Sequence, residues 1–332
     1  MFKLKTNPDD FYVKEILDFD DHIVSVGPYS LFRLIKTNVD SNFALAKIAR
    51  ILNLKTKDIG YCGIKDKRAV TEQYITIPSR SRDKAKSIDL KDQGITLEYI
   101  SEFSDRLNVG DLDGNFFKIV VRNLDDQEVA AMKKNISERK KFPNYYGEQR
   151  FSENNISVGR SLIKRKFSDA VDILKNDPSY SRDLNEHLDK NPNDYVGALS
   201  KLPKHMLIFF VHAYQSYLWN LCIEKLVNSD LKLEQEDFPI IGFYFRPSAI
   251  IDKISRPILN QEKITPRDFV IRELPFLSAE GGSRDIYLKP EEINYVVEDD
   301  EINKKKRKAI LEFTLRKGSY ATSFIEQLFK MH

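Results

Sequence analysis

From about residue 155 the patterns in this chain change from alternating strands and helices to a succession of helices, and strand patterns return from about residue 281. A helical block between two segments of mixed pattern is typical of one domain inserted into another. At 332 residues the chain is also longer than one typical core. We therefore predict an α+β domain made of residues 1–154 and 281–332, with a mostly helical domain of residues 155–280 inserted into it.

The two outer segments contain most of the predicted strands. Strand patterns occur at residues 11–17, 31–35, 73–77, 95–103, 117–122 and 309–315. A helix capped by Ser41 or Asn42 is expected, and further helices are expected over residues 127–140 and 320–329. In the inserted block, residues 158–175 are expected to form a helix broken near Phe167, and an apolar stripe extends from Leu207 to Cys222. Short strand patterns recur at residues 240–245 and 269–271.

Several classes of function are disfavoured by what the sequence lacks. It has no phosphate-binding loop, dinucleotide fingerprint, nucleophile elbow or zinc-protease motif, and its histidines form no metal-ligand cluster. Two cysteines, Cys62 and Cys222, are too few for a disulfide framework or a zinc site. We found no run approaching the roughly 20 apolar residues of a membrane span, and no signal peptide. These features predict a cytoplasmic protein, or a nuclear one if the source has a nucleus, with no membrane partner and no evident obligate protein partner.

Charge is concentrated in short runs although the net charge is only +3. Basic runs occur at residues 139–141, at Arg160 with residues 164–166, and at residues 304–308, while residues 298–301 are acidic. Concentrated basic runs suit a nucleic-acid partner, and each of them also fits a solvated helix face.

One carboxylate, Asp66, lies among Lys65, Lys67 and Arg68 in the segment 60–74. Neighbouring cations favour an ionised aspartate, and the glycines at positions 60 and 63 permit tight turns or close approach to a ligand. This arrangement fits a catalytic loop, and taken alone it also fits a solvated basic loop.

Five segments, in order along the chain, resemble the TruD family of tRNA pseudouridine synthases. They are Lys5 with residues 7–15 (NPDDFYVKE), residues 63–73 (GIKDKRAVTEQ), 114–117 (GNFF), 143–151 (PNYYGEQRF) and 315–322 (LRKGSYAT). Residues 213–220 (AYQSYLWN) match in their helical character. The resemblance implies a pseudouridine-synthase-like fold, with a mixed, mainly antiparallel sheet, flanking helices and an inserted helical domain that forms the other wall of an RNA cleft.

The resemblance also implies a reaction that needs neither cofactor nor metal. A uridine in folded RNA, expected to be uridine 13 in the D arm of tRNA, is cut at its glycosidic bond, and the base turns and is rejoined through carbon. Asp66 falls on the position of the family's catalytic carboxylate, acting on the sugar, on the base or as a proton acceptor. Lys5 falls on the position of its basic partner.

Further residues take roles by the same resemblance. Phe117 is placed over the extruded base, Asn115 at the uracil edge, and Phe11 and Tyr320 in the uridine pocket. Phe116, on the opposite strand face from Phe117, is expected to be the core residue of the two. Lys65, Arg68 and Arg150 are candidates either for phosphate contacts or for bracing the pocket.

We therefore predict a tRNA pseudouridine synthase, with other structured RNAs as further candidate substrates. Two rivals remain at this point. One is a catalytically silent RNA-binding protein or tRNA-folding chaperone, which would not need the carboxylate. The other is a small-molecule hydrolase using Cys62 or Asp66. The lack of a histidine near Cys62 in the sequence argues against it. We expect Cys62 to be a small buried residue.

Overall fold

The computed structural model describes residues 2–138, 140–152 and 154–330. Arg139, part of one predicted basic run, lies outside them. The chain forms two compact units. Unit 1 comprises Met1–Lys140, Lys289–Ala321 and Ile325–His332, and unit 2 comprises Lys141–Leu288 and Thr322–Phe324. The functional domain limits expected at residues 154 and 281 stay a prediction.

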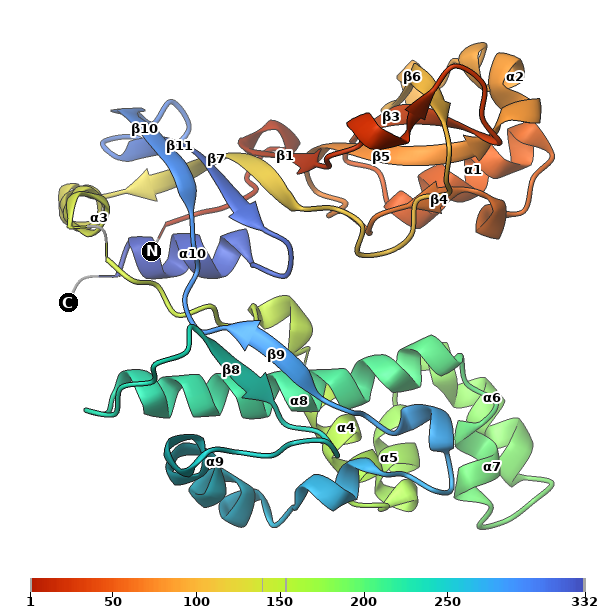
Figure 1. Cartoon of the computed structure of the whole chain (residues 1–332), viewed down its shortest axis with the longest axis vertical. Coiled ribbons are helices and arrows are strands. Elements are labelled where there is room, and N and C mark those ends of the chain that lie inside the picture. Colours follow the sequence, from red (N-terminus) through yellow and green to blue (C-terminus); the bar gives the residue numbers. More distant parts are fainter. Residues whose placement is uncertain (1, 139, 153, 331–332) are drawn as a thin grey trace. The chain divides into compact units, whose positions relative to one another are not determined.

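Unit 1 is built on a nine-stranded sheet, drawn in Figure 1. Its strands follow the spatial order β10 (Glu291–Asp299), β11 (Arg307–Arg316), β7 (Gly114–Leu124), β1 (Phe11–Ile16), β5 (Val70–Pro78), β3 (Tyr29–Thr37), β6 (Ile95–Phe103) and β2 (Ile23–Val24), and β4 (Gly60–Tyr61) pairs with β5. Only β1 and β5 run parallel among these pairs. The expected mixed, mainly antiparallel sheet is confirmed.

The helices that accompany this sheet are α1 (Ser41–Leu52), α2 (Arg82–Lys86) and α3 (Asp126–Ser137), and α10 (Ala321–Leu328) follows β11, with its residues Thr322–Phe324 grouped with unit 2. Under α1, Leu45, Ile48 and Leu52 join buried side chains of β3 and β5 in one core. The expected cap of α1, Ser41 or Asn42, is wrong. Asp40 caps the helix, and its side chain accepts a hydrogen bond from the backbone N–H of Phe43. The hydroxyl of Ser41 is therefore available for another contact.

Unit 2 is a helical block with a two-stranded antiparallel sheet. Its elements are α4 (Asn155–Ile163), α5 (Phe167–Leu174), α6 (Pro178–Leu188), α7 (Tyr195–Leu199), α8 (Lys204–Val227), α9 (Ala249–Glu262) and the paired strands β8 (Asp237–Ile240) and β9 (Gly282–Asp285). The break expected near Phe167 is confirmed, since α5 begins there. The strand expected over residues 269–271 is wrong: Phe269 ends a short 3-10 helix, and it packs with Ile271 in the core of the unit.

Helix α8 has the length and apolarity of a membrane span, which the sequence reading did not anticipate. Most of its apolar side chains, among them Phe210, Tyr214, Leu218 and Trp219, are buried in the core of unit 2. The core of a folded unit accounts for this composition.

An ion cluster, buried except for Glu301, ties together three distant parts of unit 1, and we call it the Arg122 cluster. The guanidinium of Arg122, at the end of β7, donates to Asp10 Oδ1 over 2.8 Å, to Glu301 Oε1 over 2.9 Å and to Asp300 Oδ1 over 3.2 Å. Asp10 ends the turn before β1, and Asp300 and Glu301 follow β10. Four charged groups thus fix the turn that precedes the first strand.

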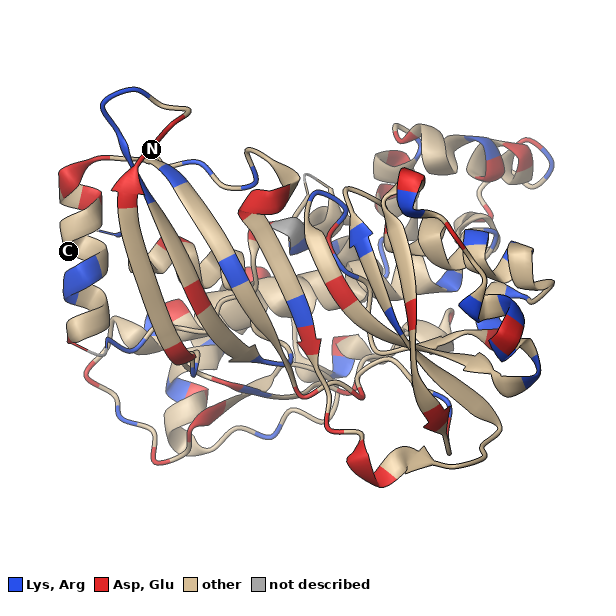
Figure 2. Ribbon diagram, turned by 90° about the horizontal axis from the view of Figure 1, so that it is seen from above, with Lys and Arg blue, Asp and Glu red and all other residues tan. Residues whose placement is uncertain are grey.

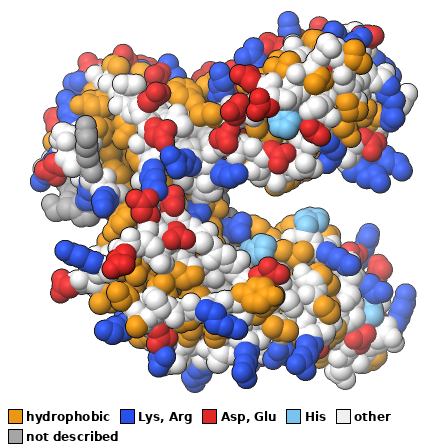
Figure 3. Space-filling model, viewed as in Figure 1, with side chains coloured by type: hydrophobic (Ala, Val, Ile, Leu, Met, Phe, Trp, Pro, Cys, Tyr) orange, Lys and Arg blue, Asp and Glu red, His pale blue; other side chains and the backbone are white. Residues whose placement is uncertain are grey.

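Both signs of charge occur along the strands of the sheet (Figure 2). The face shown in Figure 3 likewise carries Lys and Arg side chains interspersed with Asp and Glu. This distribution agrees with a net charge of only +3.

Candidate active site

Asp66 lies in the loop between β4 and β5, and hydrogen bonds from neighbouring elements fix that loop. The hydroxyl of Ser41 donates to the carbonyl oxygen of Lys65 over 3.1 Å and accepts from its backbone N–H over 3.2 Å. The amide nitrogen of Gln73 donates to the carbonyl oxygen of Gly63 over 3.3 Å. Lys36 Nζ donates to the carbonyl oxygen of Asp66 over 2.6 Å. The loop is therefore held through its backbone, and none of these bonds uses the Asp66 carboxylate.

The structure brings Lys5 and Asp66 together. Lys5 Nζ lies 2.6 Å from Asp66 Oδ2, and the two side chains are 17% and 36% exposed. The same ammonium lies 4.3 Å from the centre of the Phe11 ring. Lys5 has a φ of 53°, a left-handed backbone conformation that is uncommon for a non-glycine residue. Asp66 is thus paired with the Lys5 ammonium group and remains accessible to solvent.

A second ion pair lies beneath this one. Lys65 Nζ lies 2.7 Å from Glu15 Oε1 and donates to Asn115 Oδ1 over 3.0 Å. Glu15 is buried, and burial raises the pKa of its carboxyl group while the charge of Lys65 opposes that rise. Glu15 and Asn115 are direct partners across β1 and β7, so the register of these strands brings both to Lys65. With its side chain only 10% exposed, Lys65 has little surface to offer a phosphate.

Aromatic rings lie beside these ion pairs. The Phe117 ring meets the Phe11 ring edge-on at 6.4 Å and stacks on Phe313 at 5.4 Å. Phe117 is 7% exposed, whereas Phe116 is half-buried. The expectation that Phe116 is the core residue of the two is therefore wrong. Both neighbouring strands, β1 and β11, supply a phenylalanine that packs beside Phe117, which explains its burial.

The remaining predicted residues lie at different distances from this centre. Arg68 is exposed, and its guanidinium donates to the carbonyl oxygen of Thr6, next to Lys5. Tyr320 directly precedes α10 and is half-buried in unit 1. Arg150 belongs to unit 2, where its guanidinium lies 5.1 Å from the ring centre of Phe209. The structure thus joins Arg68 to the N-terminal segment and holds Arg150 on an aromatic ring.

Sequence reasoning missed three residues that hold the site, namely Glu15, Lys36 and Ser41. A signal for two of them exists in the alternation of the strands. Glu15 falls in phase with buried Phe11 and Val13, and Lys36 falls in phase with buried Phe32 and Leu34. A charged residue at an inward strand position requires a buried partner, and here both partners belong to the Asp66 loop.

Cys62 and candidate metal ligands bear on the rival readings. Cys62 is buried, as expected, and burial raises the pKa of its thiol to about 12. A buried thiol of that acidity is unsuited to be a nucleophile near neutral pH. In the part of the chain that the structure describes, no group of three or more His, Cys, Asp or Glu side chains is placed to hold a metal ion.

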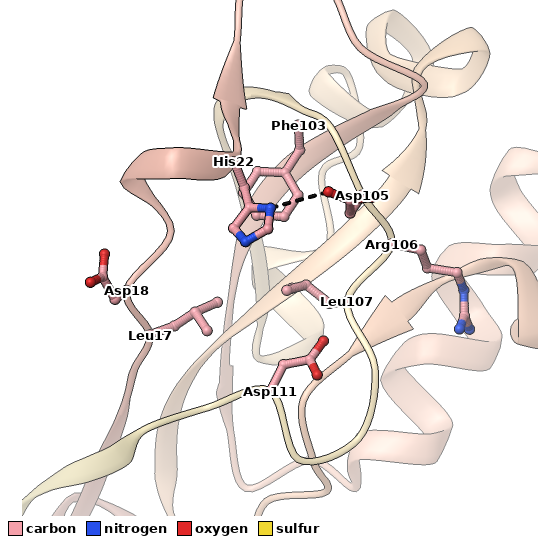
Figure 4. Close-up of a pocket in the computed structure, with 8 residues that line it drawn as sticks. All are labelled: Leu17, Asp18, His22, Phe103, Asp105, Arg106, Leu107 and Asp111. Atoms are coloured by element: carbon pink, nitrogen blue, oxygen red, sulfur yellow. Dashed lines mark hydrogen bonds and ion pairs between the residues drawn. The ribbon is translucent and has the colours of Figure 1, made fainter.

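A separate pocket in unit 1 contains neither Asp66 nor Lys5. It is lined by Leu17, Asp18, His22, Phe103, Asp105, Arg106, Leu107 and Asp111, and His22 pairs with Asp105 at its side (Figure 4). Three carboxylates against one arginine make this lining unfavourable for a phosphate backbone.

Comparison with known proteins gives matches along nearly the whole chain. A family model described as tRNA pseudouridine synthase D (TruD) matches residues 2–179, 172–238 and 237–328. A probable tRNA pseudouridine synthase D 2 of Methanocaldococcus jannaschii is 32% identical, over 98% of this chain and 91% of that protein. A tRNA pseudouridine synthase D of Aquifex aeolicus is 27% identical, over 98% of each chain.

A solved structure is similar as well. The crystal structure of a putative tRNA pseudouridine synthase D (TruD) from Methanosarcina mazei superposes with a TM-score of 0.77 at 25% identity. The match covers 99% of this chain and 94% of that chain.

Proposed function

Because the chain belongs to the tRNA pseudouridine synthase D (TruD) family, we propose that it isomerises uridine to pseudouridine in tRNA, at uridine 13 of the D arm, with Asp66 as the catalytic carboxylate. The observation that carries this proposal is the Lys5–Asp66 ion pair at 2.6 Å. It supplies an ionised, oriented carboxylate that is still open to solvent. A protein that only binds RNA does not need such a group.

The reaction breaks the bond between N1 of uracil and C1′ of ribose and forms a bond between C5 and C1′. The proton on C5 must then leave, and N1 ends protonated. Asp66 serves as nucleophile at C1′, as nucleophile at C6 of the base, or as the group that removes a sugar proton. Each of these routes needs a carboxylate at this position, which is the part of the mechanism that the proposal commits to.

The neighbours of Asp66 then bind the base. Uracil must leave its stack to reach the loop, and the aromatic side chains Phe11, Phe117 and Tyr320 are its proposed receivers. Lys65 donates to the side-chain oxygen Oδ1 of Asn115. The side-chain nitrogen Nδ2 of Asn115 can then donate to a uracil carbonyl. Arg68 is exposed beside Lys5 and is placed to meet a phosphate of the flipped nucleotide.

The test is site-resolved mapping of pseudouridine in a tRNA transcript after incubation with the purified protein. Product at position 13, and none when that position carries cytidine, is the expected result. Asp66→Asn keeps the side-chain volume and removes the charge, so it should bind tRNA and form no product. Asp9→Asn is the matched control, because Asp9 is exposed in the turn before β1 and should keep full activity.

The outcomes separate the possibilities. Product at another uridine would keep the family reaction and refute position 13. Turnover by Asp66→Asn would refute the role of that carboxylate. Tight binding of tRNA without product from the wild type would favour the silent RNA-binding protein.

A further inference from the structure

Lys36 is a buried cation that the proposed reaction does not use. It lies near the end of β3, opposite Thr71 of β5 and Ile95 of β6, and its side chain is fully buried. Lysine is almost never fully buried without a paired charge. Among the described residues, however, no carboxylate oxygen lies within ion-pair distance of its ammonium group.

The acceptors of Lys36 are instead two backbone carbonyls of the catalytic loop. Its Nζ donates over 2.6 Å to the carbonyl oxygen of Asp66 and over 3.4 Å to that of Lys65. A hydrogen bond from an ammonium group is shorter and stronger than one between neutral groups. The backbone carbonyl group next to the Cα of Asp66 is thus held by a charge-assisted hydrogen bond.

Keeping a charge at this place is unfavourable for folding. Burial lowers the pKa of Lys36 to about 8, against the opposing effect of the Asp66 and Asp40 charges, and the Lys65 charge lowers it further. A methionine or leucine would fill the same volume without that cost. The two carbonyl oxygens that accept from Lys36 belong to the loop with the reactive carboxylate, so the buried charge has a role in holding that loop.

We propose that Lys36 is a positioning residue for the isomerisation: its ammonium group fixes the peptide group of Asp66 and thereby aims the carboxylate at the substrate. This inference rests on the proposed function, because it assigns Lys36 a role only through Asp66. Without the donor, the peptide group can rotate, and the carboxylate moves with it. A displacement of about 1 Å at a reacting group can lower the rate about 100-fold.

The first experiment compares two substitutions that both remove the charge of Lys36. Lys36→Met also removes the donor, whereas Lys36→Gln keeps an amide that can donate. We expect kcat to fall about 100-fold for Lys36→Met and less for Lys36→Gln. The affinity for tRNA should stay within about twofold for both, since Lys36 is buried and has no surface to offer RNA. Lys91→Met is the matched control, because Lys91 is exposed in the same unit, and its kcat should equal that of the wild type.

Thermal melting tests whether a lower kcat of Lys36→Met only reflects a smaller folded fraction. Removing a buried charge offsets the loss of the hydrogen bonds, so Lys36→Met should melt close to the wild type. A rate loss that only follows the lost folded fraction would overturn the proposal, as would a wild-type kcat in Lys36→Met.

The pH dependence of kcat tests the role of the Lys36 charge, because a role in packing alone would not change it. With a pKa of about 8, Lys36 is charged below that pH and neutral above it, so wild-type kcat should fall as pH rises through about 8. That alkaline limb should be missing from both variants, which carry no charge at this position at any pH. Persistence of the limb in Lys36→Met would overturn the proposal.

The same series distinguishes this inference from the proposed function. If the wild type forms no pseudouridine, or Asp66→Asn does, the proposed function fails and the role of Lys36 fails with it. If both behave as proposed while Lys36→Met keeps its kcat and alkaline limb, only the role of Lys36 is refuted.

Discussion

At the scale of single residues, loss of the Lys65 cation should lower the stability of the fold. Lys65→Met leaves the carboxyl group of Glu15 buried with no cation, and breaking a buried ion pair costs about 3–5 kcal/mol. Burial already raises the pKa of Glu15, and in the variant nothing from Lys65 opposes it. The folded state then binds the proton more tightly than the unfolded state, so the free energy of unfolding falls as pH rises above the usual glutamate range. Urea denaturation between about pH 4 and pH 8 measures this.

The double variant Glu15→Gln with Lys65→Met is its control. It removes both charges, so it should recover part of the lost stability and lose the pH dependence. A single variant as stable as the wild type at the alkaline end of that range would contradict the importance of the pair.

Phe117 needs a substitution that separates its packing from its proposed contact with uracil. Phe117→Ala would cost about 3–5 kcal/mol of stability in this buried position and would report little else. Phe117→Leu keeps most of the volume but loses the ring face, so kcat should drop by the equivalent of about 1–3 kcal/mol. Phe117→Tyr keeps the ring and should remain active. Single-turnover rates on tRNA, corrected for the folded fraction, test both.

Phe313→Leu is the matched control for Phe117→Leu. Phe313 stacks on Phe117 from β11 and is fully buried, yet it has no proposed contact with the base. It should lose similar stability and keep most of its kcat. Equal rate losses in the two variants would mean that Phe117 acts only through packing.

The sequence predicts the residues that carry a family motif but not those that hold them. Asp66 and Lys5 are 61 positions apart, and their ion pair follows from the placement of two loops that no local pattern encodes. Glu15 lies inside a matched motif, yet for its partner Lys65 the sequence leaves a phosphate contact and bracing of the pocket both open, because sequence gives no burial. Ser41 was read as a helix cap, a role that Asp40 fills, and it binds the loop instead.

At the scale of elements, the Arg122 cluster joins the turn before β1 to β7 and to the segment after β10. Arg122→Met leaves Asp10 and Asp300 buried without their cation and should destabilise unit 1 by about 3–5 kcal/mol. Lys118→Met is the control on the same strand, because its pair with Glu312 is exposed and should contribute less than about 1 kcal/mol. Chemical denaturation of both variants provides the comparison, and equal losses would refute the role of burial.

The pH dependence of this cluster has a definite sign. Although burial would raise it, hydrogen bonds from the backbone N–H of Asn123 and from Asn303 hold the pKa of Asp300 well below its usual range. A carboxyl group with a lowered pKa stabilises the fold at neutral pH and loses that effect as pH falls through the lowered value. The stabilising contribution of Asp300 should therefore persist from neutral pH down to about pH 4 and be lost below that, which acid denaturation measures.

Strands with one buried face were predictable, and the exposed edge strand β10 was not. Strands β1, β3 and β11 alternate between buried and less buried positions and were expected close to their observed limits. Strand β10 was missed, since as the last strand of the sheet it is exposed along nearly its whole length and has no apolar alternation. The pattern at residues 269–271 misled because two buried side chains in alternation also suit an irregular segment over a core.

At the scale of the whole molecule, the basic runs differ in how many of their charges are available. In the run 164–166, Arg165 donates to the carbonyl oxygen of Val270 and lies 3.5 Å from Glu273, so part of its role is structural. Lys164 and Lys166 are the better candidates for RNA contacts, since the pair of Lys166 with Asp169 is long, at 3.9 Å, and exposed.

The run 304–308 is more fully neutralised at its end. Lys308 pairs with Glu298 and Glu301, and Arg307 pairs with Asp299. These two cations are therefore poorer candidates for binding a phosphate than the lysines of the run 164–166.

We expect Lys164→Ala with Lys166→Ala to weaken tRNA binding. Each lost phosphate contact should reduce the slope of log K against log salt concentration by roughly 0.7 to 0.9. Turnover at saturating tRNA should hardly change. Binding measured over a salt series decides this, and Lys308→Ala, which removes a charge that is already paired, is the control. An unchanged slope would identify this run as solvated surface.

The place of β11 in the sheet has a consequence for synthesis. Strand β11 inserts between β10 and β7, and β7 carries Asn115 and Phe117. On the ribosome, every residue of unit 2 up to Leu288 emerges before β11 does. Until then the edge of β7 has no partner from β11 and is open to pairing with other nascent chains. A product that terminates before residue 307 already contains Asp66, Lys5 and Phe117 but lacks β11 and Tyr320, so we expect it to be inactive although it carries the proposed catalytic carboxylate.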